Sequence, residues 1–399
     1  ASGQTVALKA DGTVEAVTGV TEGVGTPVVF ENSYSRNFSA VYDSTNNKVV
    51  IAYRDSGRTL AKAVVGTVSG TSISFGTPVV FNSASTYAIS AAYDSTNNKV
   101  VIAYKDQGNS EYGTAIVGTV SGTSISFGSE VVFQTTATNY NSVVYDPTNN
   151  KVVIAYTNQA TGYGTAIVGT VSGTSISFGT AVVFESASAD DFQSVYDSTN
   201  NKIVISYKDG GNSNYGTAIV GTVSGTAISF GTAVVFDNSD SLQLASVFDS
   251  SSNKVVTAYR DGGNDYGRVV VGTVSGTSIS FGTIVVFNSA ATSFLSAVYD
   301  STNNKIVIAY QDGGNSSYGT TIVGTVSGTS ISFGSEAVFE SAATTYTATT
   351  FDSSLNKVVI AYTDGGNSSY GTAVVFQLAS TNNTDFIGIT AEAISDTAT

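Results

Sequence analysis

The chain has 399 residues, a formal net charge of −14 and only 12% charged residues. It contains no Cys and no His, which excludes disulfides, thiolate metal sites, Cys nucleophiles and histidine general bases. The negative charge disfavours a nucleic-acid partner, and no apolar run approaches the roughly 20 residues that cross a bilayer, so we expect no membrane insertion.

Residues 1–23 predict an N-terminal β-hairpin extension. The runs Gln4–Ala10 and Thr13–Val17 flank Asp11-Gly12, a dipeptide typical of tight two-residue turns. Because the chain begins with Ala1, we expect it to be part of a longer polypeptide.

A motif close to D-S-T-N-N-K-V-V-I-A-Y then recurs at alternating spacings of 51 and 52 residues. A fixed period of this size predicts units that bury their apolar faces against their neighbours. We number the seven repeat units by their repeated Asp, which is Asp43, Asp94, Asp146, Asp197, Asp249, Asp300 or Asp352.

Each unit predicts four strands: a (S-A-A-Y), b (K-V-V-I-A-Y), c (A-I-V-G-T-V) and d (S-I-S-F through V-V-F). In strand b of unit two, Val100, Ile102 and Tyr104 share one face, and Val101 and Ala103 share the other. Both faces are apolar, so both must be covered. Seven such units predict an all-β, seven-bladed β-propeller of four-stranded antiparallel blades, because a β-helix has shorter repeats and a leucine-rich or ankyrin array carries helices.

The chain ends predict how the ring closes. Unit seven has no d strand after Phe376, whereas Gly25–Phe30 is a d strand without strands before it. We therefore expect the N-terminal strand to complete the last blade, which removes a free sheet edge. This places the propeller at 24–377 and leaves 378–399 as a C-terminal strand that docks on the N-terminal hairpin.

Variation among the units predicts the binding face. All length differences fall in the b–c loops, and the d–a connectors vary in content at constant length. Antiparallel order puts these two sets on one rim, and the uniform a–b and c–d turns on the other. Variable loops on a rigid scaffold commonly bind ligands, so we expect any ligand on the b–c/d–a rim.

Aromatic and charged residues of this rim are the candidate site. Six b–c loops end in Tyr-Gly; either the ring packs against the next blade and Gly permits a tight turn, or the tyrosines stack on sugars. Phe294 and several connector residues add to them. The candidates are Tyr34, Arg36, Tyr87, Tyr112, Tyr140, Tyr163, Asp190, Asp191, Tyr215, Tyr266, Tyr318 and Tyr370.

The sequence supports a catalytic role or a metal site less well than it supports ligand binding at the rim. The D-G-G-N loops are similar to Asp-box turns and to calcium loops, but one Asp and one Asn per loop supply few of the six to eight oxygens that calcium takes. Asp190 and Asp191 are adjacent and would point opposite ways. The repeated Asp of D-S-T-N-N-K suits a turn-stabilising role. We expect no enzyme activity, no metal and no cofactor.

The motifs D-S-T-N-N-K-V-V-I-A-Y and V-G-T-V-S-G-T-S-I-S-F-G resemble a repeat of tail-fibre-like virion structural proteins of marine bacteriophages and related bacterial surface proteins. The resemblance implies an extracellular location, on a virion surface, and an adhesive or structural role. We expect a non-catalytic fibre or appendage protein that binds a host surface polysaccharide. The alternative is a structural spacer that contacts other virion or filament proteins. The oligomeric state stays open.

Overall fold

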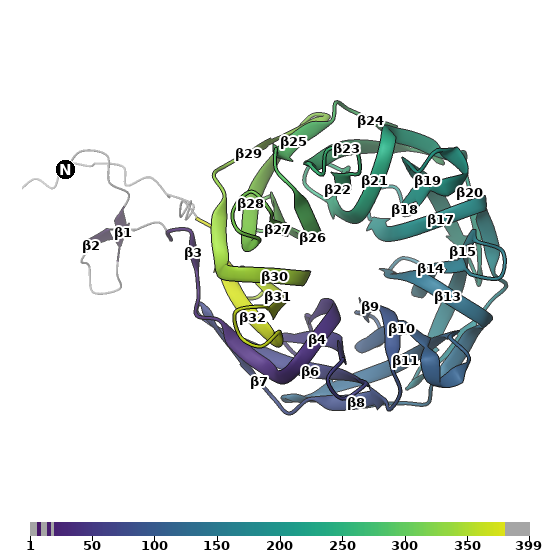
Figure 1. The fold of residues 1–399 in the computed structure, drawn as a ribbon, viewed down its shortest axis with the longest axis horizontal. Coiled ribbons are helices and arrows are strands. Elements are labelled where there is room, and N and C mark those ends of the chain that lie inside the picture. Colours follow the sequence, from purple (N-terminus) through teal and green to yellow (C-terminus); the bar gives the residue numbers. More distant parts are fainter. Residues whose placement is uncertain (1–5, 9–13, 17–19, 380–399) are drawn as a thin grey trace, which may run out of the picture.

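The computed structural model describes residues 6–8, 14–16 and 20–379. Within these residues the chain is antiparallel β-structure with two short 3₁₀ turns, at Gln107–Asn109 and Gly210–Asn212, and no α-helix. Successive sheets stand around a central opening in a β-propeller-like arrangement (Figure 1). No helix in the described ranges has the length and apolar character needed to cross a membrane.

The N-terminal part contains β1 (Val6–Leu8), β2 (Val14–Ala16) and β3 (Gly23–Val24). Strand β1 pairs with β2, and Leu8 lies opposite Val14. The Asp11-Gly12 turn lies outside the described residues, as do residues 380–399, which include nearly all of the predicted C-terminal strand.

In the repeat units, strands a, b and c follow one another in each sheet and differ little from unit to unit. The a strands are β4 (Val28–Asp43), β9 (Thr86–Asp94), β13 (Val131–Asp146), β17 (Val182–Asp197), β21 (Val234–Asp249), β26 (Thr292–Asp300) and β30 (Ala337–Asp352). The b strands are β5 (Lys48–Asp55), β10 (Lys99–Asp106), β14 (Lys151–Asn158), β18 (Lys202–Asp209), β22 (Lys254–Asp261), β27 (Lys305–Asp312) and β31 (Lys357–Asp364). The c strands are β6 (Leu60–Ser69), β11 (Tyr112–Ser121), β15 (Tyr163–Ser172), β19 (Tyr215–Ser224), β23 (Gly267–Ser275), β28 (Tyr318–Ser327) and β32 (Tyr370–Gln377).

The predicted d strand is two separate segments, which corrects the sequence interpretation. In unit one, Phe75 lies opposite Gly66 and Val79 lies opposite Ala63, so both segments pair with the same c strand. Gly76 lies between the two segments, and its backbone passes so close to the next unit that a Cβ would lie 1.9 Å from the Thr123 carbonyl oxygen. The S-I-S-F segments are β7 (Ser72–Phe75), β12 (Ser124–Phe127), β16 (Ser175–Phe178), β20 (Ala227–Phe230), β24 (Ser278–Phe281) and β29 (Ser330–Phe333).

The d–a connector is also different from the predicted loop. In five units the V-V-F segment continues through the connector into strand a as one 16-residue strand, such as β4. Its start pairs with one sheet and its end with the next, because Val28 lies opposite Ala373 whereas Ser35 lies opposite Asp55. Only units two and six break it, leaving β8 (Val79–Asn82) and β25 (Val285–Asn288) as separate strands.

The core lies between neighbouring sheets. Val100, Ile102 and Tyr104 pack in one apolar cluster, and Val101 and Ala103 pack in the next. The prediction that both faces of strand b are covered is therefore confirmed. Complete burial of one Val or Ile side chain stabilises the fold by about 1.5–3 kcal/mol.

In six of the seven units, the buried tyrosine near the end of the b strand donates a hydrogen bond to a carboxylate. Tyr53 donates to Glu31 at 3.0 Å, and the equivalent tyrosines of units four, five and seven likewise reach the acidic residue that follows V-V-F. In units two and six that residue is Asn82 or Asn288, and the glutamate just before the V-V-F or A-V-F segment of the same unit accepts instead. These pairs are Tyr104 with Glu130 and Tyr310 with Glu336, each at 2.7 Å. In unit three the residue is Gln134, and the Tyr156 hydroxyl has no partner among the described residues.

The first and last units contact each other. Val24 lies opposite Phe376, and Val28 lies opposite Ala373, so the N-terminal segment pairs with β32. Tyr53 of unit one shares an apolar cluster with Val359 of unit seven. Gly25 approaches the Thr71 carbonyl oxygen as closely as Gly76 approaches that of Thr123.

Candidate functional site

Each a strand carries a two-residue bulge at the same place. In unit one, Arg36 and Ser39 pair with β5 while the two residues between them do not. The first bulge residue is always six positions before the repeated Asp and has a left-handed backbone, with φ between 48° and 54°. These residues are Asn37, Ala88, Tyr140, Asp191, Gln243, Phe294 and Tyr346.

None of these seven left-handed positions is glycine. A left-handed conformation costs a non-glycine residue about 1–2 kcal/mol, and it is rarer still for bulky side chains such as Tyr140, Phe294 and Tyr346. Strained backbone of this kind concentrates at functional sites. The residue type also changes around the ring, whereas the partner b strands are almost identical.

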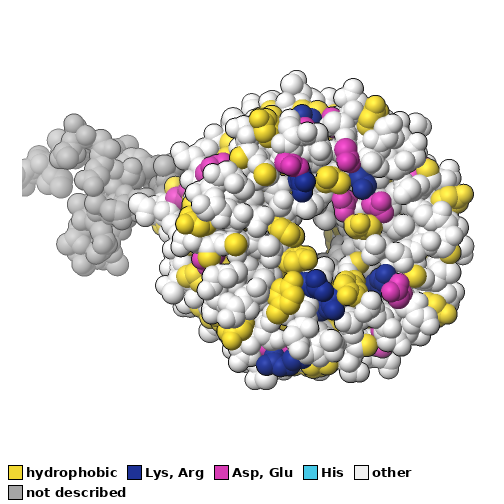
Figure 2. All heavy atoms as spheres, viewed as in Figure 1, with side chains coloured by type: hydrophobic (Ala, Val, Ile, Leu, Met, Phe, Trp, Pro, Cys, Tyr) yellow, Lys and Arg dark blue, Asp and Glu magenta, His cyan; other side chains and the backbone are white. Residues whose placement is uncertain are grey.

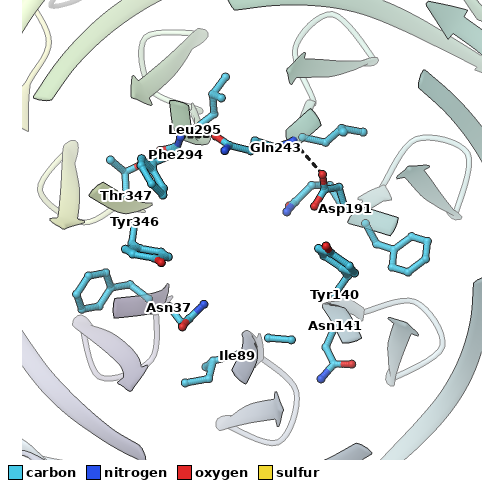
Figure 3. A pocket seen from close by; sticks show the side chains of 15 residues that line it. Asn37, Ile89, Tyr140, Asn141, Asp191, Gln243, Phe294, Leu295, Tyr346 and Thr347 are labelled. Atoms are coloured by element: carbon cyan, nitrogen blue, oxygen red, sulfur yellow. Dashed lines mark hydrogen bonds between the residues drawn. The ribbon is translucent and has the colours of Figure 1, made fainter. Parts of the chain in front are cut away.

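The seven bulges line one cavity of about 330 Å³. Figure 3 shows Asn37, Tyr140, Asp191, Gln243, Phe294 and Tyr346 arranged around the opening. The rings of Phe294 and Tyr346 lie 4.9 Å apart at 47°. The cavity therefore combines aromatic faces with amide, carboxylate and hydroxyl groups.

The second bulge residue fills the space between sheets and fixes the first. It is Phe38, Ile89, Phe192, Leu244 or Leu295 in five units, and these side chains are buried or partly buried in the apolar clusters. The exceptions are Asn141 and Thr347. Asn141 is 8% exposed, and both polar atoms of its amide lack a partner within the described structure.

Hydrogen bonds join the bulges around one side of the cavity. The backbone N–H of Gln243 donates to the Asp191 carboxylate at 3.2 Å, and the Gln243 side-chain oxygen accepts from the backbone N–H of Phe294. The Thr347 hydroxyl donates to the carbonyl oxygen of Phe294. Side chains at the cavity are thus held across three unit boundaries.

Burial raises the pKa of the half-buried Asp191 carboxyl above its usual range. The hydrogen bond from Gln243 and the charge of Lys208 oppose this shift, and the nearby Asp190 and Asp240 add to it. Asp190 itself lies opposite Lys208 in the strand pairing, with 3.9 Å between its Oδ2 and the lysine Nζ. The two adjacent carboxyls therefore have different surroundings.

Deeper in the channel, the edges of neighbouring a strands are joined by serines. Ser39 accepts from the backbone N–H of Ala91, Ser90 from that of Val143, and Ser142 from that of Ser194. A second cavity of about 200 Å³ lies along this wall.

The structure brings some of the predicted site residues together and leaves others apart. Tyr140 and Asp191 line the cavity. Arg36 contacts the rings of Tyr34 and Tyr87, with 5.5 and 5.8 Å between its Cζ and the ring centres. The six tyrosines of Tyr-Gly are half-buried at, or one residue before, the start of six different c strands, and none lines a described cavity; they are Tyr112, Tyr163, Tyr215, Tyr266, Tyr318 and Tyr370.

The glycine of Tyr-Gly has another role than the predicted tight turn. Gly113 does not have a left-handed backbone, and a Cβ there would lie 2.5 Å from the Phe133 ring. The glycine therefore makes room for the V-V-F phenylalanine, and the other five glycines lie equally close to theirs.

Two further predictions concern the loops. The b–c loops do lie beside the connectors, since Ser56 N–H donates to the Tyr34 carbonyl and Gly262 N–H to that of Asp240. The repeated Asp stabilises its turn, as Asp43 accepts from the backbone N–H groups of Thr45 and Asn46. In the part of the chain that the structure describes, no three acidic side chains gather closely enough to hold a metal ion.

Sequence reasoning missed Asn37, Ala88, Gln243 and Tyr346 as cavity residues. The available signal was their fixed place six residues before the repeated Asp, where the residue type changes from unit to unit. Asn37 and Asp191 are residue types that adopt a left-handed backbone, but Ala88, Tyr140, Gln243, Phe294 and Tyr346 are not, so the residue types together do not indicate a shared bulge.

Comparisons with solved structures find the same fold in unrelated sequences. A chain of the mitotic checkpoint complex aligns over 90% of this chain and 96% of its own, with a TM-score of 0.56 and 10% identity. A protein from Lactobacillus plantarum aligns over 85% and 92%, with a TM-score of 0.55 and 10% identity. A triple arginine-to-alanine mutant of AofleA from Arthrobotrys oligospora aligns over 79% and 92%, with a TM-score of 0.51 and 8% identity.

These similarities support a β-propeller-like repeat fold, and they support neither a number of blades nor a function. The sequence matches no protein-family model, and no curated protein matches it either.

Proposed function

We propose that the chain is a seven-bladed propeller closed by its N-terminal strand, and that it binds a glycan at the channel mouth formed by the seven bulges. The pairing of Val28 with Ala373 and the packing of Tyr53 with Val359 support the closure. Seven clusters of apolar side chains, one for each contact between neighbouring units in the described chain, support the number of blades.

The observation that carries the binding proposal is the ring of seven strained, dissimilar residues around one cavity. Purely structural positions in near-identical units would be expected to carry the same residue, or glycine, which adopts this backbone without strain. Retaining Tyr140, Phe294 and Tyr346 there costs stability, and a ligand contact is the physical reason we infer.

The chemistry of the ring suits a saccharide. Aromatic faces such as Phe294 and Tyr346 can stack on sugar rings, and Asn37, Asp191 and Gln243 offer donors and acceptors for hydroxyl groups. A volume of about 330 Å³ is at the lower end of small-molecule sites, which span about 300–1,000 Å³. It fits a terminal sugar or short branch better than a long chain.

The proposed setting is the surface of a virion or an extracellular appendage, where a non-catalytic propeller would attach to a host polysaccharide. The motif resemblance supports this setting, and the absence of His and Cys from the sequence favours binding over catalysis. The alternative is a spacer that contacts only other proteins of the particle or filament.

A panel of bacterial surface polysaccharides tests the proposal with three proteins. These are the unaltered chain, a cavity variant (Tyr140→Gly with Tyr346→Gly) and an outer-rim variant (Tyr215→Ala with Tyr318→Ala). Glycine suits the left-handed backbone, so we expect the cavity variant to stay folded and to lose saturable binding. The outer-rim variant should bind as the unaltered chain does.

The other outcomes are informative. Loss of binding in the outer-rim variant alone would move the site to the Tyr-Gly positions. No binding of the unaltered chain to any polysaccharide or candidate cell would favour the spacer role.

A further inference from the structure

Two arginines face each other beside the channel mouth without a carboxylate. Arg36 on β4 lies directly opposite Arg54 on β5. Arg58, Arg260 and Arg268 each form an ion pair with Asp or Glu, whereas in the described part of the chain Arg36 and Arg54 form none. In a chain of net charge −14, this local excess of positive charge stands out.

Arg54 is buried in this position. Arg54 as a whole is 7% exposed, and its Nε and Nη1 atoms have no hydrogen-bond partner among the described residues. Burying unpaired guanidinium donors is costly, and like charges directly opposite each other in a sheet are destabilising. The arrangement therefore lowers the stability of the free protein.

The same strand position in the other units avoids this cost. Asp190 lies opposite Lys208 in unit four, and Thr345 lies opposite Thr363 in unit seven. The repeated scaffold thus tolerates complementary or neutral pairs, and packing does not require two arginines.

Aromatic rings pack against the guanidinium groups of the two arginines. The Arg54 Cζ lies 4.0 Å from the centre of the Tyr87 ring, and Arg36 lies near the same ring and that of Tyr34. Burial would lower the pKa of Arg36, but the Tyr346 hydroxyl and the neighbouring tyrosines outweigh it and raise the pKa. Tyr346 lines the cavity, so Arg36 borders the proposed glycan site, and Arg54 lies opposite Arg36 in the strand pairing. Figure 2 shows dark-blue basic side chains at the lower edge of the central opening and magenta acidic side chains at its upper right; elsewhere around the opening the two kinds lie side by side.

We propose that Arg36 and Arg54 form an oxyanion subsite that holds a carboxylate or sulfate group of an acidic saccharide entering the channel mouth. The planar guanidinium group matches the two oxygens of such anions. The anion would supply the missing partner of Arg54 and screen the repulsion between the two cations. This inference rests on the proposed glycan function and names the class of glycan.

The first experiment needs no glycan. Thermal unfolding is followed in sodium sulfate, sodium galacturonate and sodium chloride at equal ionic strength, for the unaltered chain, Arg54→Gln, Arg36→Gln and Arg260→Gln. Arg260 is the matched control because it holds the equivalent strand position in unit five and pairs with Asp265. We expect a saturable rise of the unfolding midpoint with sulfate or galacturonate in the unaltered chain and in Arg260→Gln, and loss of that saturable part in the other two.

The second experiment measures saccharide binding by calorimetry, with polygalacturonate, dextran sulfate and neutral dextran. We expect at least one acidic polymer to bind, about tenfold more weakly to Arg54→Gln, which is the effect of losing one charge-assisted hydrogen bond. Preference for polygalacturonate assigns a carboxylate, and preference for dextran sulfate assigns a sulfate.

Equal anion responses in all four proteins would overturn the subsite. If neutral glycans bind at the cavity while Arg54→Gln changes nothing, the glycan function stands and this inference fails. If small anions act through Arg36 and Arg54 but no glycan binds, the subsite stands as an anion site and the glycan function fails.

Discussion

The hydroxyl of Tyr104 donates across 2.7 Å to Glu130, which lies just before V-V-F in the same repeat unit. The position that carries the accepting carboxylate in other units is Asn82, whose side-chain oxygen accepts from the Ala84 N–H instead. The Asn82 amide also donates to Glu130, at 2.8 Å. A near-identical tyrosine, Tyr156, has no such partner. The two positions therefore form a natural comparison of a satisfied and an unsatisfied buried hydroxyl.

We expect Tyr104→Phe to lower the free energy of unfolding by about 1.5–3 kcal/mol, because it removes a buried hydrogen bond to a charged group. Tyr156→Phe should be neutral or slightly stabilising, because it removes a buried hydroxyl that has no partner. Urea unfolding followed by circular dichroism measures both. Equal losses in the two variants would contradict the pairing.

Gly76 and Gly334 occupy the same place in F-G-T/S turns but have different surroundings. A Cβ on Gly76 would lie 1.9 Å from the Thr123 carbonyl oxygen, whereas the nearest atom to one on Gly334 is 3.9 Å away. We expect Gly76→Ala to destabilise the fold by at least about 1–3 kcal/mol, the usual cost of overpacking. Gly334→Ala should be neutral or stabilising by up to about 1 kcal/mol, since it restricts the unfolded chain. The unfolding midpoints of the two variants measure this difference. Equal changes in the two midpoints would show that the close approach of Gly76 to Thr123 does not affect stability.

Removing residues 1–30 should expose the edge of β32, because Val24 and Val28 then no longer pair with Phe376 and Ala373. Free strand edges pair with other chains, so we expect concentration-dependent association. Size-exclusion chromatography with light scattering measures it. A chain that lacks only residues 1–19 is the control and should behave as the full chain does. A monodisperse, equally stable chain without residues 1–30 would refute the closure.

Asp191→Asn should stabilise the protein at neutral pH. Burial raises the pKa of this carboxyl in the folded state, so the folded protein binds the proton more tightly than the unfolded chain does. The resulting destabilisation is present at neutral pH and disappears as the pH falls through the raised folded pKa towards the ordinary carboxyl value of about 3.9. Asparagine keeps an acceptor for the Gln243 N–H. Thermal unfolding at a series of pH values should show the advantage of the variant shrinking on acidification, and a constant difference would contradict it.

The repeat and the strands could be predicted because the sequence pattern that indicates each strand lies within that strand itself. In K-V-V-I-A-Y, the alternation of Val100, Ile102 and Tyr104 with Val101 and Ala103 indicates two covered faces, and the structure buries both. The turn role of Asp43 likewise follows from its own segment.

The bulges could not be predicted, because their cause lies outside the segment. Tyr140 and Phe294 prefer extended backbone, and only the strand register on either side places them in a left-handed bulge. The roles of Gly76 and Gly113 depend on contacts with Thr123 and Phe133. The cavity is lined by bulge residues of the a strands, whereas the tyrosines chosen from repetition alone lie at or next to the starts of separate c strands.

The bulge residues belong to no ladder of hydrogen-bonded strand pairs, so exchanging the side chain at one of the seven positions leaves the scaffold's pairings in place. Natural selection can therefore retune what the opening recognises one position at a time, with little risk of misfolding. Substitutions among related chains should then accumulate six residues before the repeated Asp while the strands stay constant. In this sense the chain separates its architecture from its specificity, as an antibody does with framework and hypervariable loops.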